Sequence, residues 1–406
     1  MNIELNGRRH FLKTAGLGAS GFLLGVPAAF ADSKTSTDAT GPRIESPFNG
    51  AVLNHRHGKK VADGMIVRVA GQAASDAAIT VNGQPARRNG QQFEADVVLR
   101  QKETPITAAA TDASGRVQKD TVRVVWDRYS RPRYRFTIDD NCFFLRDIAQ
   151  KRPKSIFDCF YLKILRDLNE KYGTKFSLNI FYTTGDDFSL PDFPDCYKGE
   201  WRDNSSWLKL AFHAHANMPD RPYQDAPPEK LIADLDKVNE QILRFAGKET
   251  FSTPTVTHWA MVRPSAYRPL YERGVRVLSG YFRPNSKGKY DINYRVDDKR
   301  SAYLSKHDAL VDFDSGIVFS RVDIICNTTP IDKIVPTLAP LTEDPNQAEI
   351  MDLLTHEQYF WPFYSNYLPD HGQRLDTAIR FVTEKGYEPV FFHEGFLGGK
   401  EPDAKA

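Results

Sequence analysis

Residues 134–141 read Tyr-Arg-Phe-Thr-Ile-Asp-Asp-Asn, an alternating run of apolar and polar side chains that leads into two adjacent carboxylates. Alternation with a period of two predicts a β-strand over 134–138, with successive side chains on opposite faces. The chain turns where such a strand ends, so Asp139 and Asp140 can both reach one crevice. Paired acids in this position are a recurrent way to seat a metal ion beside a catalytic base. The alternative is a plain acidic turn, because Asp and Asn favour turns.

Strands and helices alternate throughout the chain that follows. Strands are predicted over 176–181, 208–213, 275–278 and 388–392, and helices over 156–172, 227–245, 264–274 and 375–385. Repeated β-then-α order predicts parallel strands with crossover helices, in either a barrel or an open sheet. We therefore expect one α/β domain over residues 129–400.

Metal-capable side chains recur at the predicted strand ends. After Asp139 and Asp140 come His213 with His215, His258, His356 with Glu357, and His393 with Glu394. These positions hold five of the ten histidines. Because the carboxyl ends of parallel strands meet at one edge, we expect the side chains to gather into one site. For His258 and His393 a packed histidine is an equally good interpretation, and His307 and His371 are expected at the surface.

Residues 42–128 have a different pattern, with short alternating runs separated by turn signals. The runs are 66–69, 79–81, 93–97, 106–110 and 122–125, and Asn82-Gly83 is a strong hairpin turn. This spacing predicts an all-β sandwich. The segments 44–50 and 81–83 resemble bacterial immunoglobulin-like modules, and no residue here has a catalytic pattern. The chain is thus predicted to be multidomain.

The N-terminal residues predict export. Arg8-Arg9 begins a twin-arginine pattern, a weakly apolar run covers 15–26, and Ala29-Phe30-Ala31 matches a cleavage site. We interpret residues 1–31 as a twin-arginine signal peptide, the alternative being an ordinary secretory signal. Residues 32–41 have the composition of a disordered linker. The predicted partner is the twin-arginine export machinery, and the predicted location is the periplasm or the exterior.

Composition excludes some classes of protein. The chain has 406 residues, 41% of them hydrophobic, and a formal net charge of +2. A near-neutral charge argues against a dedicated nucleic-acid binder, and no run in the mature chain is apolar enough to span a membrane. The cysteines show no Cys-x-x-Cys spacing, so a structural zinc site is not indicated. The sequence does not decide between disulfides and isolated thiols for Cys142, Cys159, Cys196 and Cys326.

Several motifs together resemble the polysaccharide deacetylase (NodB-like) family, in the order that family has them. Thr137-Ile138-Asp139-Asp140 resembles its Thr-Phe-Asp-Asp motif, and Phe212-His213-Ala214-His215 falls where it has metal-binding histidines. Leu353-Leu354-Thr355-His356 resembles its late Leu-x-His motif. The resemblance covers roughly residues 133–396 and implies a (β/α) barrel of the deacetylase type.

The resemblance also implies roles for these residues. Asp140 and His213 would bind a divalent metal ion, and mixed nitrogen and oxygen ligands suit zinc. Asp139 would be the general base and His356 the general acid. Glu394 or Arg263 would orient one of these two groups, although Arg263-Pro264 only approximates the family's arginine motif. The implied activity is removal of N- or O-acetyl groups from a glycan.

The third metal ligand is left open by the sequence. The family separates its two histidines by three residues, whereas only Ala214 separates His213 from His215. Residues two apart on a strand share a face, which favours His215. If the chain turns after His213, Asp220 or Asn217 becomes the candidate instead.

Aromatic residues crowd the same strand ends and suit a sugar groove. Trp259, Tyr223 and Trp361 are the candidates for substrate binding, the alternative being that they belong to the core. Two other functions stay open. Asp139, Glu357 and Glu394 could act as paired acids of a glycoside hydrolase, or the protein could bind glycans without catalysis.

Overall fold

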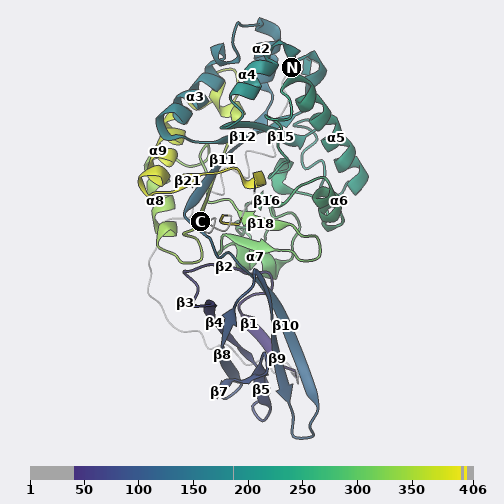
Figure 1. Cartoon of the computed structure of the whole chain (residues 1–406). Coiled ribbons are helices and arrows are strands. Elements are labelled where there is room, and N and C mark those ends of the chain that lie inside the picture. Colours follow the sequence, from purple (N-terminus) through teal and green to yellow (C-terminus); the bar gives the residue numbers. More distant parts are fainter. Residues whose placement is uncertain (1–40, 186, 395–396, 400–406) are drawn as a thin grey trace, which may run out of the picture. The chain divides into compact units, whose positions relative to one another are not determined.

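The structure is a computed structural model that describes residues 41–185, 187–394 and 397–399 (Figure 1). The predicted signal peptide and almost all of the predicted linker lie outside these residues. The chain divides into two compact units, Met1–Trp126 and Asp127–Ala406, which we call the N-terminal and C-terminal units. The sequence places this boundary at residue 128.

Two sheets of mainly antiparallel strands form the described part of the N-terminal unit. One has the order β1-β4-β8-β7 with β3 beside β4, and the other has the order β2-β10-β9-β5-β6. The strands are β1 (Arg43–Ser46), β2 (Val52–Leu53), β3 (Lys59–Val61), β4 (Gly64–Gln72), β5 (Ala78–Val81), β6 (Gln84–Pro85), β7 (Arg87–Asn89), β8 (Gln92–Leu99), β9 (Glu103–Thr111) and β10 (Val117–Trp126). Buried and exposed residues alternate along β8, as in a strand with one face in a core. Asn82 and Gly83 both have positive φ and connect β5 to β6, as the hairpin signal predicts.

A mixed α/β architecture around a parallel sheet makes up the C-terminal unit. The sheet has the order β15-β12-β11-β20-β19, and β21 also pairs with β11. Its strands are β11 (Arg133–Asn141), β12 (Phe176–Phe181), β15 (Leu208–Ala214), β19 (Ile324–Ile325), β20 (Ile350–His356) and β21 (Glu388–Pro389). Every residue of β11 and β12 is buried, because helices cover parallel strands on their outer face. Two smaller sheets combine β13 (Thr183–Gly185) with β14 (Phe188–Ser189), and β16 (Val277–Gly280), β18 (Val318–Arg321) and β17 (Ala309–Val311).

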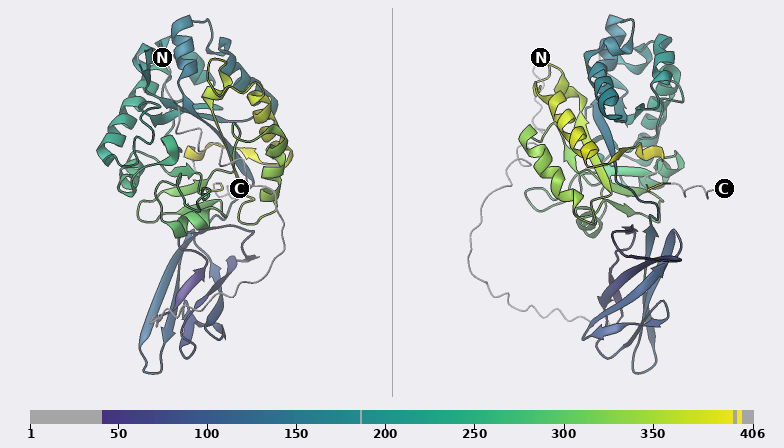
Figure 2. Two further views of the ribbon diagram at one scale, coloured as in Figure 1. Left: turned by 180° about the vertical axis from the view of Figure 1, so that it is seen from behind. Right: turned by 60° about the vertical axis from the view of Figure 1, so that its left-hand side comes forward.

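Amphipathic helices flank these strands. They are α2 (Phe143–Lys151), α3 (Phe160–Tyr172), α4 (Lys198–Asp203), α5 (Pro228–Phe245), α6 (Tyr267–Glu272), α7 (Asp298–Leu304), α8 (Ile331–Leu338) and α9 (His371–Glu384). Leu231, Leu235, Val238 and Ile242 form the buried face of α5. Helices α3, α8 and α9 lie on one side of the parallel strands and α5 and α6 on the other (Figure 1), and the view from behind shows the yellow and green helices on opposite sides (Figure 2). Gly173 ends α3 with a φ of 71°, a left-handed conformation that favours glycine.

Backbone hydrogen bonds continue the parallel sheet beyond β15. They run from Leu210 to Thr250, Ser252 to Leu210, Ser279 to Thr255, Val322 to Gly280 and Asp323 to Asp352. Backbone hydrogen bonds therefore connect each neighbouring pair in the spatial order β15, residues 250–255, β16, β18 and β20. Within the described residues, no helix has the length and apolarity needed to cross a membrane. The cysteines, all of which the structure describes, are free thiols.

Candidate metal centre

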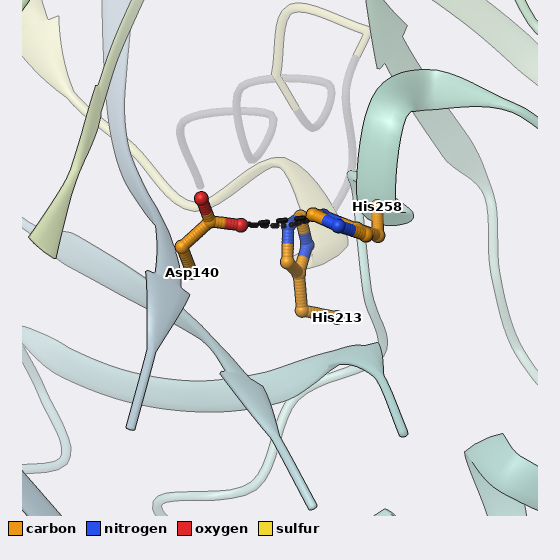
Figure 3. Close-up of side chains that lie close together, drawn as sticks. All are labelled: Asp140, His213 and His258. Carbon is orange, nitrogen blue, oxygen red and sulfur yellow. Dashed lines mark hydrogen bonds and ion pairs between the residues drawn. The ribbon is translucent and has the colours of Figure 1, made fainter. Parts of the chain in front are cut away.

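Three buried side chains from distant parts of the sequence meet at the carboxyl end of the parallel sheet. Asp140 comes from the end of β11, His213 from the end of β15, and His258 from the short helix η4 (His258–Ala260) (Figure 3). Oδ1 of Asp140 lies 3.3 Å from Nε2 of His213 and 3.2 Å from Nδ1 of His258. The two imidazole nitrogens lie 3.2 Å from each other. One carboxylate oxygen and two nitrogens therefore form a nearly equilateral triangle.

Two β-bulges present Asp140 and His213 to this triangle. Between Ile138 and Asn141, β11 has one residue more than β12, and β15 has one residue more than β12 at His213. A bulge inserts an unpaired residue and redirects its side chain, which is why bulges recur beside active sites. Asp140 also has a φ of 59°, a left-handed conformation that non-glycine residues rarely adopt. Conformations of this kind persist where the surrounding structure holds them in place.

The orientation of His258 is fixed by the backbone around it. Its Nε2 lies 3.2 Å from the carbonyl oxygen of Asn217, which can only accept a hydrogen bond. Nε2 therefore carries the proton, and Nδ1 presents its lone pair to Asp140 and His213. The next two residues, Trp259 and Ala260, have φ values of 63° and 46°, so a strained turn holds the ring in place.

Opposing effects act on His213 in this environment. Burial alone would lower its pKa, because a charged imidazole loses solvation. The charge of Asp139 and the hydrogen bond and charge of Asp140 outweigh burial, and the pKa of His213 is raised. The site therefore favours positive charge at this position, whether a proton or a metal ion supplies it.

The donor set of the triangle fits a divalent metal ion. Two imidazole nitrogens and a carboxylate oxygen are ligands that zinc takes in proteins, and the three donor atoms lie within 4.8 Å of one another. Ligands at roughly 2.0–2.1 Å from a tetrahedral zinc ion are separated by about 3.3 Å. The separations of 3.2 and 3.3 Å match this spacing. The cluster of Asp140, His213 and His258 could thus hold a metal ion.

Asp139 and His356 lie beside this cluster on adjacent strands. They are direct partners in the register of β11 and β20, so their side chains share one face. Four residues earlier on the same face, Arg135 and Asp352 form an ion pair of 2.6 Å, as expected for facing partners. Asn179 donates a 2.6 Å hydrogen bond to Oδ1 of Asp139, which is 4% exposed.

Asn327 holds His356 in a defined orientation. Its Oδ1 lies 2.9 Å from Nδ1 of His356 and also accepts a hydrogen bond from Thr355. An amide oxygen only accepts, so Nδ1 of His356 carries a proton and Nε2 is the nitrogen left to exchange one. Asn327 lies just after β19, the strand beside β20.

The structure does not bring the other two predicted metal ligands to the triangle. The ring of His215 stacks on Tyr182 at 5.2 Å, because the bulge at His213 breaks the two-residue alternation that would put both histidines on one face. Asp220 is exposed in the segment after β15. Among the described residues, His258 provides the third donor atom of the triangle instead.

Glu357 and Trp361, for which the sequence predicts catalytic and substrate-binding roles, are buried and hydrogen-bonded to each other. The carboxylate of Glu357 is fully buried and accepts hydrogen bonds from the backbone N–H groups of Cys142, Phe143 and Phe144, at 2.6–2.9 Å. It also accepts one from Nε1 of Trp361, which is 4% exposed. Burial raises the pKa of Glu357 to about 7, although these donors act in the opposite direction. Glu357 therefore caps the first turn of α2.

The remaining predicted residues lie at different depths. Tyr223 is buried, receives a hydrogen bond from the backbone of His215 and donates one to Asp234. Trp259 is half-buried under the guanidinium of Arg221, at 5.1 Å. Arg263 is exposed and precedes a short helix. The backbone of Glu394 is described, but its side chain lies outside the described residues.

The sequence did not single out His258 for the triangle, or Asn179 and Asn327 as hydrogen-bond partners of Asp139 and His356. His258 was detectable as one of several histidines at strand ends, but its neighbours did not distinguish it from a packed histidine. Asn179 occupies the alternating strand 176–181 and carries no motif. Asn327 precedes a Thr-Thr-Pro turn, where Asn is common for conformational reasons alone.

Comparisons with known proteins give only remote similarities. No family model and no curated protein matches the sequence. A 4-α-glucanotransferase from Thermococcus litoralis matches with a TM-score of 0.42 and 12% identity over 65% of this chain. A polysaccharide deacetylase assigned to O-antigen biosynthesis in Bordetella bronchiseptica matches with a TM-score of 0.30 and 13% identity, covering 61% of this chain and 84% of that one.

A polysaccharide deacetylase from Bacillus cereus matches with a TM-score of 0.24 and 8% identity, covering 64% of this chain and 98% of that one. The chain spans 40% of the length of the glucanotransferase. Similarities at this level say nothing about the reaction, for which the side chains of the site are the guide.

Proposed function

We propose that this protein is an exported, metal-dependent hydrolase that removes acetyl groups from a glycan. The observation that carries the proposal is the buried triangle of Asp140, His213 and His258, with Asp139 and His356 on facing strand positions beside it. Two nitrogens and one oxygen in this spacing suit zinc, which is the metal we propose.

A metal ion held by Asp140, His213 and His258 would polarise an acyl carbonyl and lower the pKa of a water molecule. Asp139 accepts the proton of the attacking water as general base, and the hydrogen bond from Asn179 keeps its carboxylate turned toward the site. His356 donates a proton through Nε2 to the leaving amine or alkoxide, because Asn327 fixes its Nδ1. Asp139 on β11 thus removes a proton, and His356 on the neighbouring strand β20 delivers one.

The barrel is part of the proposal. The backbone links from β15 through residues 250–255 to β16, and from β18 to β20, support a sheet that closes on itself. Arg135 of β11 contacts both Asp352 and Thr255, and Asp352 also accepts a hydrogen bond from Ser279. Side chains from β11, β16, β20 and the 250–255 segment therefore point into one interior, as in a filled barrel.

The acyl and glycan parts of the proposal rest on the order of the sequence motifs. Asp139-Asp140, His213 and His356 follow the order of the deacetylase motifs, and the triangle supports a ligand role for the first histidine. The glycosidase alternative is less favoured, because the carboxylate of Glu357 is occupied by the first turn of α2. The immunoglobulin-like N-terminal module and export through residues 1–31 belong to the same proposal.

Two measurements on the full mature chain test this function. Protein purified without chelator is analysed for metals, and acetate release is assayed on acetylated oligosaccharides and on acetylated xylan. We expect about one divalent ion per chain and acetate release that Asp139→Asn abolishes. New reducing ends without acetate would indicate a glycosidase, and glycan binding with neither acetate release nor new reducing ends would indicate a non-catalytic binder. Absence of metal together with activity in EDTA would refute the proposal.

A further inference from the structure

The C-terminal unit has a pocket of about 430 Å³. Its lining includes Phe143, Arg146, Asp147, Gln150, Asp187 and Phe363. One wall is helix α2 along most of its length, which follows the end of β11, and the other includes Trp361 and Phe363, which follow the end of β20. The two strands that carry Asp139, Asp140 and His356 therefore lead directly into the walls of this pocket.

Glu357 connects the two walls to each other and to the site. It follows His356 in the chain, accepts hydrogen bonds from the first turn of α2, and accepts another from Trp361. Because all these contacts are buried, the pocket has a fixed position relative to the ends of β11 and β20. A ligand held in the pocket thus has a fixed position relative to the strands that carry the metal triangle.

The lining combines an aromatic platform with hydrogen-bonding groups. Phe363 is 59% exposed, the highest exposed fraction among the large apolar side chains of the described residues. Its ring packs against Phe143 at 5.2 Å, and the guanidinium of Arg146 lies 5.4 Å from the centre of the Phe363 ring. These contacts hold the platform in place while much of Phe363 faces solvent.

The polar groups of the pocket lie beside this platform and point to one class of ligand. Asp187 lies 3.4 Å from Arg146, Asp147 lies 2.7 Å from Lys151, and Gln150 is exposed. An apolar ligand would remove water from both ion pairs and offer no partner to Gln150, and the two carboxylates would repel a phosphate. A pyranose ring offers an apolar C–H face for the aromatic platform and a rim of hydroxyl groups for the carboxylates and the amide.

We propose that this pocket binds a sugar ring of the substrate chain while a neighbouring ring presents its acetyl group to the metal triangle. The inference rests on the proposed function and narrows it, because the substrate is then an oligosaccharide or polysaccharide rather than a single sugar. The sugar ring stacks on Phe363, and its hydroxyl groups form hydrogen bonds with Asp187, Asp147 and Gln150.

The first test measures binding without catalysis. Asp140→Ala protein is titrated calorimetrically with chitotetraose, N-acetylated chitotetraose, cellotetraose, xylotetraose and maltotetraose. We expect at least one tetrasaccharide to bind, and the double variant Asp140→Ala/Phe363→Ala to bind it about tenfold more weakly. Tyr367→Ala in the same background is the matched control, because Tyr367 is another aromatic residue with 38% exposure that does not line the pocket. No binding across the panel, or equal binding with and without Phe363, would overturn the proposal.

The second test measures catalysis on long and short substrates. Phe363→Ala should lower kcat/KM for an acetylated tetrasaccharide about tenfold more than for the corresponding acetylated monosaccharide, and Tyr367→Ala should not change this ratio. Equal losses on both substrates would overturn the pocket as a subsite while leaving the hydrolase in place. A different outcome is weaker tetrasaccharide binding in the Phe363 variant of the first test, together with no acetate release from any substrate by the parent protein. That outcome would support the pocket and refute the deacetylase activity.

Discussion

Nδ1 of His258 lies 3.2 Å from Nε2 of His213, although the two residues are 45 positions apart in the chain. Both rings are buried, and Asp140 approaches the two nitrogens on one side. Bringing three polar atoms so close in a buried place costs free energy unless a proton or a cation lies between them. Since the backbone of Asn217 fixes the proton of His258 on the far nitrogen, the near nitrogen can accept either a metal ion or a proton from Nε2 of His213.

His258→Ala should remove the metal ion, whereas His215→Ala should not. The first change deletes one of three ligands, so we expect metal affinity to fall by more than about 100-fold. Changing a residue that only hydrogen-bonds to a ligand costs up to about 100-fold, and losing the ligand itself should cost more. The second change removes a ring that stacks on Tyr182 and contributes no donor to the triangle. Metal content and zinc affinity, measured by competition with a chromogenic chelator, distinguish the two.

The pair of variants also tests the sequence interpretation against the structure. If His215→Ala lost the metal and His258→Ala kept it, the ligand set would be the one that the motif alone favoured. Circular dichroism of both variants serves as the control for folding, because each change removes one partly or fully buried ring.

Asp139→Asn should abolish turnover while the metal ion stays bound. An amide has no basic oxygen to take a proton from water, and general-base catalysis contributes roughly 10²–10⁴-fold to rate. Asp139 lies outside the triangle of donor atoms, so metal content should be unchanged. The measurement is kcat for acetate release beside metal content. A parallel loss of metal and activity would make Asp139 a ligand rather than the base.

Asn327→Ala should lower kcat with little change in KM. Without the oxygen that fixes Nδ1, the imidazole of His356 samples other orientations and tautomers, and proton delivery slows by about tenfold or more. Substrate binding and metal content do not depend on this hydrogen bond. Rescue of kcat by Asn327→Asp, which restores an acceptor at the same position, would support a positioning role, and a rise in KM alone would contradict it.

The regular elements of the C-terminal unit were largely predictable from sequence. The strand predicted over 176–181 coincides with β12 (Phe176–Phe181), and the helix predicted to end at Gly173 does so. Both depend on local signals, namely a short apolar run between polar turns and a glycine that can adopt positive φ. The parallel order of the strands followed from the β-then-α pattern, because crossover helices impose it.

The details of the site were less predictable, because bulges and burial are tertiary properties. The two-residue alternation of a regular strand would place His213 and His215 on the same face of β15. The bulge at His213 adds one residue to the strand and interrupts this alternation. The same loss of information affects Glu357, because its position after His356 gives no sign of its hydrogen bonds to the first turn of α2. His371 was expected at the surface but is 1% exposed. A single histidine at the start of a helix does not indicate in the sequence whether it is buried.

Glu357→Gln should destabilise the C-terminal unit by about 1–3 kcal/mol, because a donor replaces one of two acceptor oxygens. Three backbone N–H groups and the indole N–H converge on this carboxylate, so an NH₂ group must face at least one of them. Urea unfolding measures the change. Glu384→Gln, at the exposed end of α9, is the matched control and should stay within about 0.5 kcal/mol of the parent. Equal effects of the two changes would rule out the capping role.

His371 should make the protein less stable as the pH falls from neutrality to 5. Burial lowers the pKa of His371 to about 3 from an ordinary value of 6.5, and the charge of Arg374 acts in the same direction. The ring stacks on Phe360 at 4.0 Å, and its Nε2 lies 2.6 Å from Oγ1 of Thr355. Between pH 6.5 and about pH 3 the unfolded chain binds this proton more readily than the folded chain, so the free energy of unfolding decreases as pH is lowered. At pH 5 the contribution is about 2 kcal/mol, since one pKa unit corresponds to about 1.4 kcal/mol.

His371→Gln removes the titrating group, and its difference in unfolding free energy between pH 7 and pH 5 should be smaller than that of the parent by this amount. Tryptophan fluorescence in urea follows the transition, because four of the five tryptophans, Trp201, Trp207, Trp259 and Trp361, lie in the C-terminal unit. A difference that the substitution leaves unchanged would show that His371 takes up its proton equally well in the folded and unfolded chains.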